Sequence, residues 1–298
     1  MPLSTMKLRS KGTPMRALLR LELRRALGNR LFAVSLSVGL VFALAAAVSS
    51  IGRYELFAAT QSTYTDRFVN QFSQGAYVLW MPMSVLESLP NLFFFVAVLL
   101  VGLAYSWSFR ADVRSGYAQS VMARTTRARF YGAKACAAFV AGGTVVVVPL
   151  LVNFLIIACF VPLGTPDVVD VMVTAVWHRV FLSDVFYYSP PVYIALRCAL
   201  DFCLAGAWAT VVLAVSLLAR NLVGIVVGPY VALLVVKYVS ETLYMLSGVD
   251  WGSLTVLDHL KSRGDTFYYS GWNVLAFGLL MVSVAVAVPL LSKRRDVL

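Results

Sequence analysis

The fold of this chain is decided by the stretch at residues 110–134, which reads RADVRSGYAQSVMARTTRARFYGAK. This stretch carries six basic residues and one acid, and it separates two apolar runs at about 89–109 and 135–161. Each run reaches the roughly 20 residues that a helix needs to cross a bilayer. The stretch is therefore predicted to be a basic loop between two membrane-spanning helices.

The same alternation extends over the whole chain. Four more apolar runs complete a set of six predicted spans and lie at 31–51, 192–218, 222–240 and 272–291. Hydrophobic residues make up 60% of the chain and charged residues 13%, against about 45–50% and about 25% in soluble domains. We predict an all-α polytopic membrane protein with one transmembrane domain, 31–291, between a cytoplasmic segment 1–30 and a tail 292–298.

The basic residues also predict an orientation. With the N-terminus inside, the cytoplasmic segments hold 18 Lys and Arg and three acids, whereas the opposite segments hold five and ten. Lys and Arg are retained on the cytoplasmic side of membrane proteins. Both termini are therefore expected to be cytoplasmic, in a multi-pass protein of the cell membrane. The net charge of +11 follows from this bias and favours membrane lipids over nucleic acid as partners.

Residues 14–29 have the pattern of an amphipathic helix on the inner membrane surface. Its apolar face is formed by Met15, Leu18, Leu19, Leu23 and Ala26. Its basic face is formed by Arg16, Arg20 and Arg24. Glu22 interrupts the apolar face and needs a partner. One interpretation pairs it with Arg25 at i+3. The other pairs it with an arginine below the second span, Arg110 or Arg114.

The loop 110–134 is expected to hold two helical pieces. The mixed polar and apolar residues Asp112–Ala123 suit a short helix, and Thr125 or Thr126 can cap a second helix that continues into the third span. On the opposite side, the polar segment 52–88 contains many aromatic residues and is predicted to fold onto the membrane surface. A short interfacial helix is expected within Val168–Phe186.

Few polar groups interrupt the predicted spans. Arg197 and Asp201 are spaced i, i+4 in the fourth span and could form a structural ion pair or line a pathway. Lys237 lies near the outer end of the fifth span and could extend to the interface. Gly224 and Gly228 form a G-x-x-x-G motif, which favours close helix contact within the chain or between subunits.

The motifs of known catalytic chemistry are missing from the sequence. A phosphate-binding loop requires G-x-x-x-x-G-K-[ST], and the nearest fragment, Gly132-Ala133-Lys134, lacks the first glycine and the hydroxyl residue. The four cysteines do not have metal-ligand spacing. We therefore expect neither catalytic residues nor a metal site, and no hydrolysis of ATP by this chain alone.

Several short motifs stand at matching places in a known family. They are Leu21-Glu22-Leu23-Arg24-Arg25 with Asn29-Arg30, then Asp112-Val113-Arg114-Ser115-Gly116, then Arg124-Thr125-Thr126-Arg127, and Lys134 at the start of the third span. With this layout, the chain resembles the membrane subunits of ABC-2 type exporters. It departs from the family at Thr125, where a proline is common.

The resemblance implies a permease that forms half of a substrate pathway and takes its energy from a separate ATPase. The partners would be two copies of that ATPase, which would bind ATP and Mg, and a second permease, identical or homologous. The resemblance places the coupling contacts at Asp112, Arg114, Tyr117, Val121, Met122, Arg124 and Arg127. The N-terminal helix, with Glu22, Arg24 and Arg25, would lie beside them.

Proteins that work without ATP are the alternative. An intramembrane enzyme would need polar residues clustered at mid-bilayer depth, and this chain offers little beyond Arg197 and Asp201. A secondary transporter often shows inverted repeats, which are not evident in the sequence. An immunity protein is a third possibility in this class.

Overall fold

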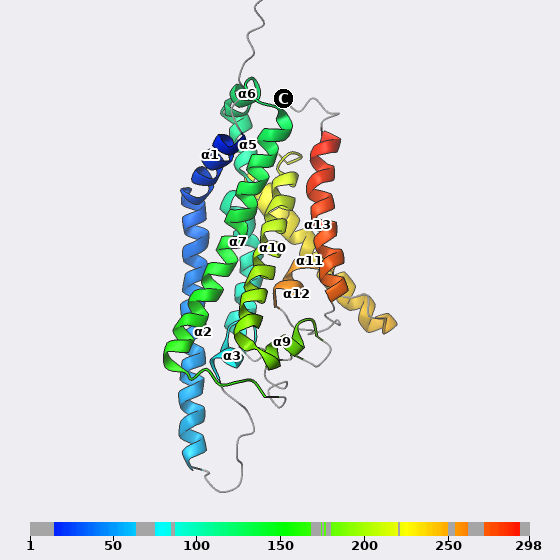
Figure 1. The fold of residues 1–298 in the computed structure, drawn as a ribbon. Coiled ribbons are helices and arrows are strands. Elements are labelled where there is room, and N and C mark those ends of the chain that lie inside the picture. The colour runs from blue at the N-terminus through cyan, green and yellow to red at the C-terminus, as the bar shows by residue number, and fades with distance from the viewer. Residues whose placement is uncertain are drawn as a thin grey trace, which may run out of the picture.

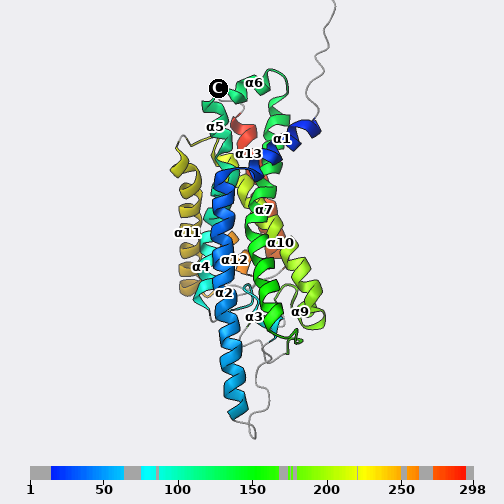
Figure 2. The ribbon, with the colours of Figure 1, turned by 90° about the vertical axis from the view of Figure 1, so that its left-hand side faces the viewer.

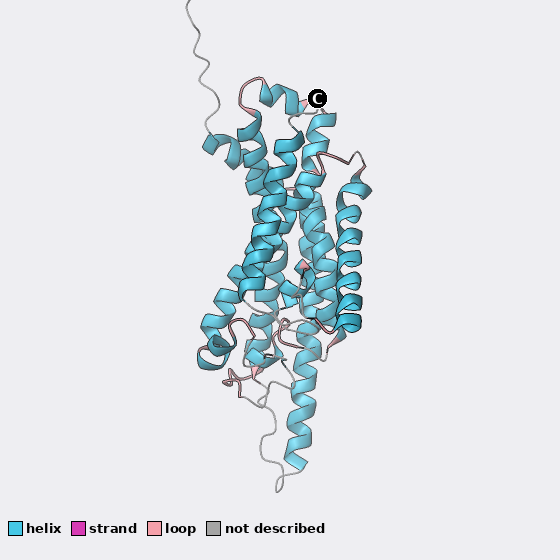
Figure 3. Cartoon of the chain, turned by 90° about the vertical axis from the view of Figure 1, so that its right-hand side faces the viewer, coloured by secondary structure: helices cyan, strands magenta, loops and turns pink. Residues whose placement is uncertain are grey.

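The computed structural model is entirely helical in the part of the chain that it describes, as Figure 3 shows. The described residues are 15–63, 75–84, 87–167, 174, 176, 180–219, 221–249, 254–261 and 271–292. Among them no strand is formed. The predicted all-α class is therefore confirmed for these ranges. The tail 293–298 and most of the predicted interfacial helix in Val168–Phe186 lie outside them.

Long helices run antiparallel between the two ends of the bundle (Figures 1 and 2). They are α2 (Arg30–Thr63), α4 (Ser88–Val101) with its continuations η1 (Gly102–Ser106) and α5 (Ser108–Arg114), α7 (Arg127–Phe160), α10 (Pro190–Val215), α11 (Leu222–Ser247) and α13 (Gly271–Ser292). The helix η1 is a single π-helical turn in the middle of the second rod. Such turns shift the register of a helix and often mark functional sites.

Short helices lie at the ends of these rods and between them. They are α1 (Met15–Leu27), α3 (Ala76–Leu79), α6 (Tyr117–Met122), α9 (Ser183–Tyr188) and α12 (Val256–Lys261). We call the end that carries α1, α5, α6 and the first turns of α7 the basic end. The C-terminal end of α13 lies at the basic end as well (Figure 1), so both ends of the described chain lie there.

Within the described ranges, five helical stretches are long and apolar enough to cross a membrane. They are Arg30–Ala59, Ser88–Arg114, Arg127–Phe160, Pro190–Val215 and Leu222–Ser247. Each overlaps one of the first five predicted spans. The apolar stretch of α13, Gly271–Ala287, is shorter, so its assignment as the sixth span stays a prediction, as does the orientation of the bundle.

The centre of the bundle is the contact between α7 and α10. At this contact a Cβ atom added to Gly142 would lie 2.6 Å from the Cβ of Ala209, and one added to Gly206 would lie 2.7 Å from the ring of Phe139. Only glycine fits at such distances. Small residues let helix backbones approach closely where no hydrophobic effect drives them together. Around this contact, α1, α2, α3 and α4 pack against α7, whereas α9, α12 and α13 pack against α10.

The segment 75–84 lies inside the bundle, and its predicted place on the membrane surface is wrong. Trp80 and Met81 are almost completely buried. The Trp80 Nε1 atom donates to a main-chain carbonyl of α7 at 3.0 Å, and the Met81 N–H donates to the Asn153 side chain at 3.1 Å. Asn153 in turn donates to the carbonyl of Ala43 in α2 at 3.0 Å. Irregular backbone is tolerated at this depth because a buried amide satisfies it.

Candidate functional site

The inner face of α1 packs against α7 rather than lying on lipid. Leu18 is 4% exposed and joins a small apolar cluster with Phe130 and Ala133 of α7, and Ala26 is completely buried. The prediction of an amphipathic helix is confirmed, but its apolar face covers protein. The apolar residues of α1 match those on the first turns of α7, which is why a surface helix docks there.

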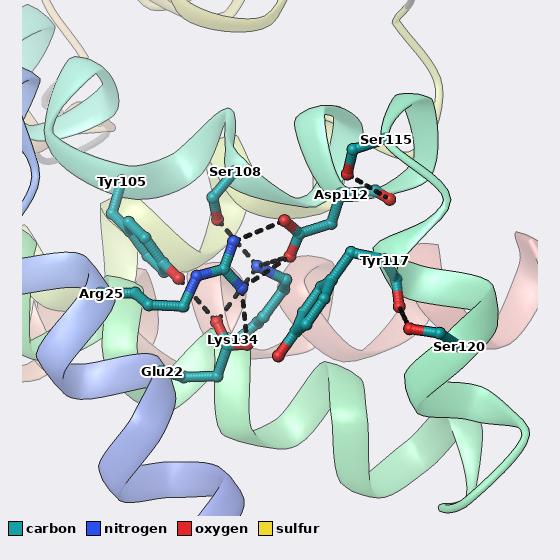
Figure 4. A network of polar contacts seen from close by, with 9 residues as sticks. All are labelled: Glu22, Arg25, Tyr105, Ser108, Asp112, Ser115, Tyr117, Ser120 and Lys134. Carbon is teal, nitrogen blue, oxygen red and sulfur yellow. Dashed lines mark hydrogen bonds and ion pairs between the residues drawn. The ribbon is translucent and has the colours of Figure 1, made fainter.

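Four charged side chains meet where α1, α5 and α7 converge (Figure 4). Glu22 and Arg25 come from α1, Asp112 from α5 and Lys134 from α7. The Arg25 guanidinium lies 3.1 Å from Glu22 and 2.7 Å from Asp112. The Lys134 Nζ lies 3.2 Å from Glu22 and 2.7 Å from Asp112. Each acid therefore contacts both bases, and we call this closed ring the charge cluster.

The charge cluster is neutral and almost dry. Glu22 and Lys134 have no exposed side-chain surface, Asp112 has 4%, and Arg25 has 38%. A charge moved out of water is costly unless opposite charges and hydrogen bonds surround it. Two acids and two bases in mutual contact meet this condition. Because removal of any one charge would leave another uncompensated, the cluster holds α1, α5 and α7 in one relative position.

Polar and aromatic side chains complete the surroundings of the charge cluster. The Tyr105 hydroxyl donates to Glu22 at 2.6 Å, and Lys134 donates to the Ser108 hydroxyl at 3.2 Å. Tyr105 lies in η1, so the π-helical turn directs its ring at Glu22. Arg25 lies 4.6 Å from the centre of the Tyr117 ring, which places α6 against the cluster through a cation–π contact.

The charge cluster also stabilises the protonated forms of two groups outside the spans. The pKa of Arg25 lies above its ordinary value, first because its guanidinium donates to Asp112. The pKa of Tyr117 is raised, first by burial and then by the nearby charge of Glu22. Arg25 therefore stays a cation and Tyr117 a neutral phenol throughout the physiological pH range.

Two partners were predicted for Glu22, and the structure confirms the local one and replaces the distant one. Local pairing with Arg25 is present, but the long-range partner is Lys134 rather than Arg110 or Arg114. Sequence reasoning missed this partner. Glu22 and Lys134 are charges of opposite sign that interrupt the apolar faces of two helices, and matching those interruptions could have predicted the pair.

The predicted coupling residues divide into two groups. Asp112 belongs to the charge cluster, and Tyr117, Val121 and Met122 are half-buried against α1 and α7. Part of each of these apolar side chains packs against α1 and α7 and part stays accessible, so their role as contacts of an ATPase stays a prediction. The exposed positions of the region include Arg114, Arg124 and Arg127, together with Gln119 and Ser120 on α6.

The two helical pieces of the loop are confirmed, with an added break. The first piece is divided into α5 and α6 by Gly116, whose φ of 76° lies in the left-handed region that favours glycine. Thr126 caps α7, since its hydroxyl accepts from the Arg129 N–H at 3.4 Å. The α5–α6 hairpin is thereby joined to a helix of 34 residues.

The polar pair of the fourth predicted span is buried and structural. Arg197 contacts Asp201 at 2.7 Å, and both are at most 1% exposed. Arg197 also donates to the main-chain carbonyl of His259 in α12, whose ring lies 4.7 Å from that of Phe277 in α13. The pair therefore links α10 to α12, as a structural ion pair would, and a pathway-lining role stays a prediction.

The remaining predicted residues lie on α11. Lys237 forms ion pairs with Glu241 at 2.7 Å and with Asp258 of α12 at 2.6 Å, so it binds protein rather than extending to the interface. A Cβ atom on Gly228 would meet nothing within 4 Å, and one on Gly224 would meet only Ala219, at 3.9 Å. The G-x-x-x-G motif therefore makes no close contact within the described chain, and its contact with another subunit stays a prediction.

Comparison of the chain with protein-family models, curated proteins and solved structures finds no match.

Proposed function

We propose that this chain is the permease subunit of an ABC-2 type exporter, driven by a separate ATPase. The observation that carries the proposal is the joint at the basic end. The exposed α5–α6 hairpin is tied by the charge cluster to α1 and continues into α7, the most extensively packed helix of the bundle. A displacement of the hairpin would be passed to α7 through the ion pair between Asp112 and Lys134, although a turn at 123–126 separates α6 from α7 in the sequence.

Such a joint suits a subunit whose energy comes from outside. Two copies of the ATPase would dock on α6, with ATP and Mg bound there, and a second permease would complete the pathway in the cell membrane. The proposed contacts are the accessible parts of Tyr117, Val121 and Met122, which are half-buried. The exposed Gln119, Ser120 and Arg124 lie beside them in the sequence. The basic end is cytoplasmic in this proposal, in agreement with the excess of Lys and Arg there.

Site-specific cross-linking in native membranes tests the proposal. A photo-reactive residue at Gln119 should capture an ATP-binding subunit, whereas the same residue at Tyr188, which is 94% exposed near the opposite end of the bundle, should not. The purified chain should lack ATPase activity, and the cross-linked complex should have it. Capture of no ATPase at Gln119, together with transport that persists without ATP, would refute the proposal.

A further inference from the structure

The acidic side chains at the basic end are buried, whereas most of its basic side chains are exposed. Among the described residues of this end, the acids are Glu22 and Asp112, and both are buried in the charge cluster. Exposed arginines surround them at Arg16, Arg20, Arg24, Arg30, Arg114, Arg124, Arg127 and Arg129. Because the charge cluster is neutral, it cancels none of the external charge. The surface of this end is therefore strongly cationic.

The outer face of α1 carries both arginines and exposed leucines. Arg16, Arg20 and Arg24 follow one another at i, i+4 spacing and point away from the charge cluster, because Glu22 defines the inner face. Exposed leucines lie among them: Leu21 is 46% exposed and Leu27 is 44% exposed. Arginines interleaved with exposed leucines are typical of a helix at the boundary between headgroups and acyl chains.

The depth of α1 agrees with that boundary. Its inner face meets Tyr105 and Lys134, which stand near the ends of the spans predicted from the sequence at 89–109 and 135–161. The next element of the chain is α2, whose candidate span begins at Arg30. Trp107, a residue type that prefers the membrane interface, lies in the same turn region and is half-buried. The arginines of α1 are thus within reach of lipid phosphates.

We propose that the outer face of α1, formed by Arg16, Arg20 and Arg24 with Leu21 and Leu27, binds anionic phospholipid headgroups. The guanidinium fork matches a phosphate group bidentately, and the leucines contact the adjacent acyl chains. Lipid that binds this face in the folded chain, and not in the unfolded chain, stabilises the folded state by mass action. Bound anionic lipid therefore stabilises the whole joint.

The test uses the full chain purified in a zwitterionic detergent and titrated with phosphatidylglycerol, with phosphatidylcholine as the neutral lipid. Thermal unfolding is followed by tryptophan fluorescence. Phosphatidylglycerol should raise the melting temperature of the wild type, and phosphatidylcholine should not. Inorganic phosphate at matched concentration should have no effect, which separates a lipid site from a site for free phosphate.

Two triple variants remove the same charge from different places. R16Q/R20Q/R24Q should need at least about tenfold more phosphatidylglycerol for half of the shift, since each basic residue near an anionic surface strengthens binding by a factor of about five. R124Q/R127Q/R129Q should respond like the wild type. The Lys triple at the three α1 positions keeps the charge and should retain most of the shift, which shows that the helix still folds.

An unchanged response of R16Q/R20Q/R24Q would overturn the proposal, as would an equal loss in R124Q/R127Q/R129Q. A shift with inorganic phosphate alone would also overturn it. The measurement involves no ATPase, so its outcome is independent of the proposed transport function.

Discussion

Removal of Lys134 is the most direct perturbation of the charge cluster. The Lys134→Met variant keeps the length of the side chain and deletes its charge. Glu22 and Asp112 then face Arg25 alone, and the cluster acquires one net negative charge beside two buried carboxylates. Loss of one partner from a buried ion pair costs roughly 3–5 kcal/mol, and the complete burial of Lys134 places this variant in that range.

Three further variants are compared with Lys134→Met to show that the loss of stability comes from the missing charge. Arg25→Met should cost less, about 1–2 kcal/mol, because the 38% exposure of Arg25 lets water screen the lost charge. Glu22→Gln combined with Lys134→Met restores neutrality, so the double variant should be more stable than the sum of the two single effects. Arg129→Met, at an exposed position of the same helix, serves as the control and should be nearly neutral.

The free energy of unfolding is measured by titration of mixed micelles with a denaturing detergent, followed by circular dichroism. We expect the loss of free energy of unfolding to be smallest for Arg129→Met, larger for Arg25→Met and largest for Lys134→Met. Equal midpoints for Lys134→Met and Arg129→Met would refute the view that the cluster holds α1, α5 and α7 together. Strict additivity in the double variant would refute the contact between Glu22 and Lys134.

Three further predictions use the same chain. Gly142→Ala should destabilise the protein by about 1–3 kcal/mol because its Cβ would collide with α10, whereas Gly228→Ala has open space and should be neutral or slightly stabilising in the same unfolding assay; equal effects would contradict the assigned packing. Asn153→Leu leaves the buried Met81 N–H without its acceptor, whereas the Ala43 carbonyl keeps its bond within α2, so the variant should cost about 1–3 kcal/mol. Thr144→Val, which removes a bond within one turn, should cost less than half as much, and the reverse order would refute the role of Asn153. In a cysteine-free background, Ser120→Cys should resist a membrane-impermeant thiol reagent in intact cells and react after permeabilisation; labelling in intact cells would invert the proposed orientation.

Much of the fold could be predicted from local sequence. A membrane span depends on the hydropathy of about 20 consecutive residues, so the sequence alone predicts six spans, five of which overlap a long apolar helix of the structure. A helix cap depends on one side chain and the backbone three residues away, and Thr126 was identified for that reason. The break at Gly116 was missed because a left-handed residue is one of several roles that glycine can take.

The sequence also indicated that Glu22 needed a partner, but it could not name Lys134. These residues are 112 positions apart, and their meeting depends on the rotation and depth of α1 against α7. Neither the rotation nor the depth of α1 can be derived from a short stretch of sequence. The same holds for the segment 75–84: its aromatic residues and polar neighbours suit a membrane surface as well as a buried insertion.

The amino-acid sequence by itself therefore determined which stretches of this protein are apolar helices and where its positive charge accumulates. Only the tertiary structure decided which charges neutralise one another and which remain exposed. The physical reason is that transfer of a helix into an apolar environment is governed by the sum of its residues, whereas an ion pair requires atoms of distant helices within about 4 Å. Packing through glycines such as Gly142 sets those distances.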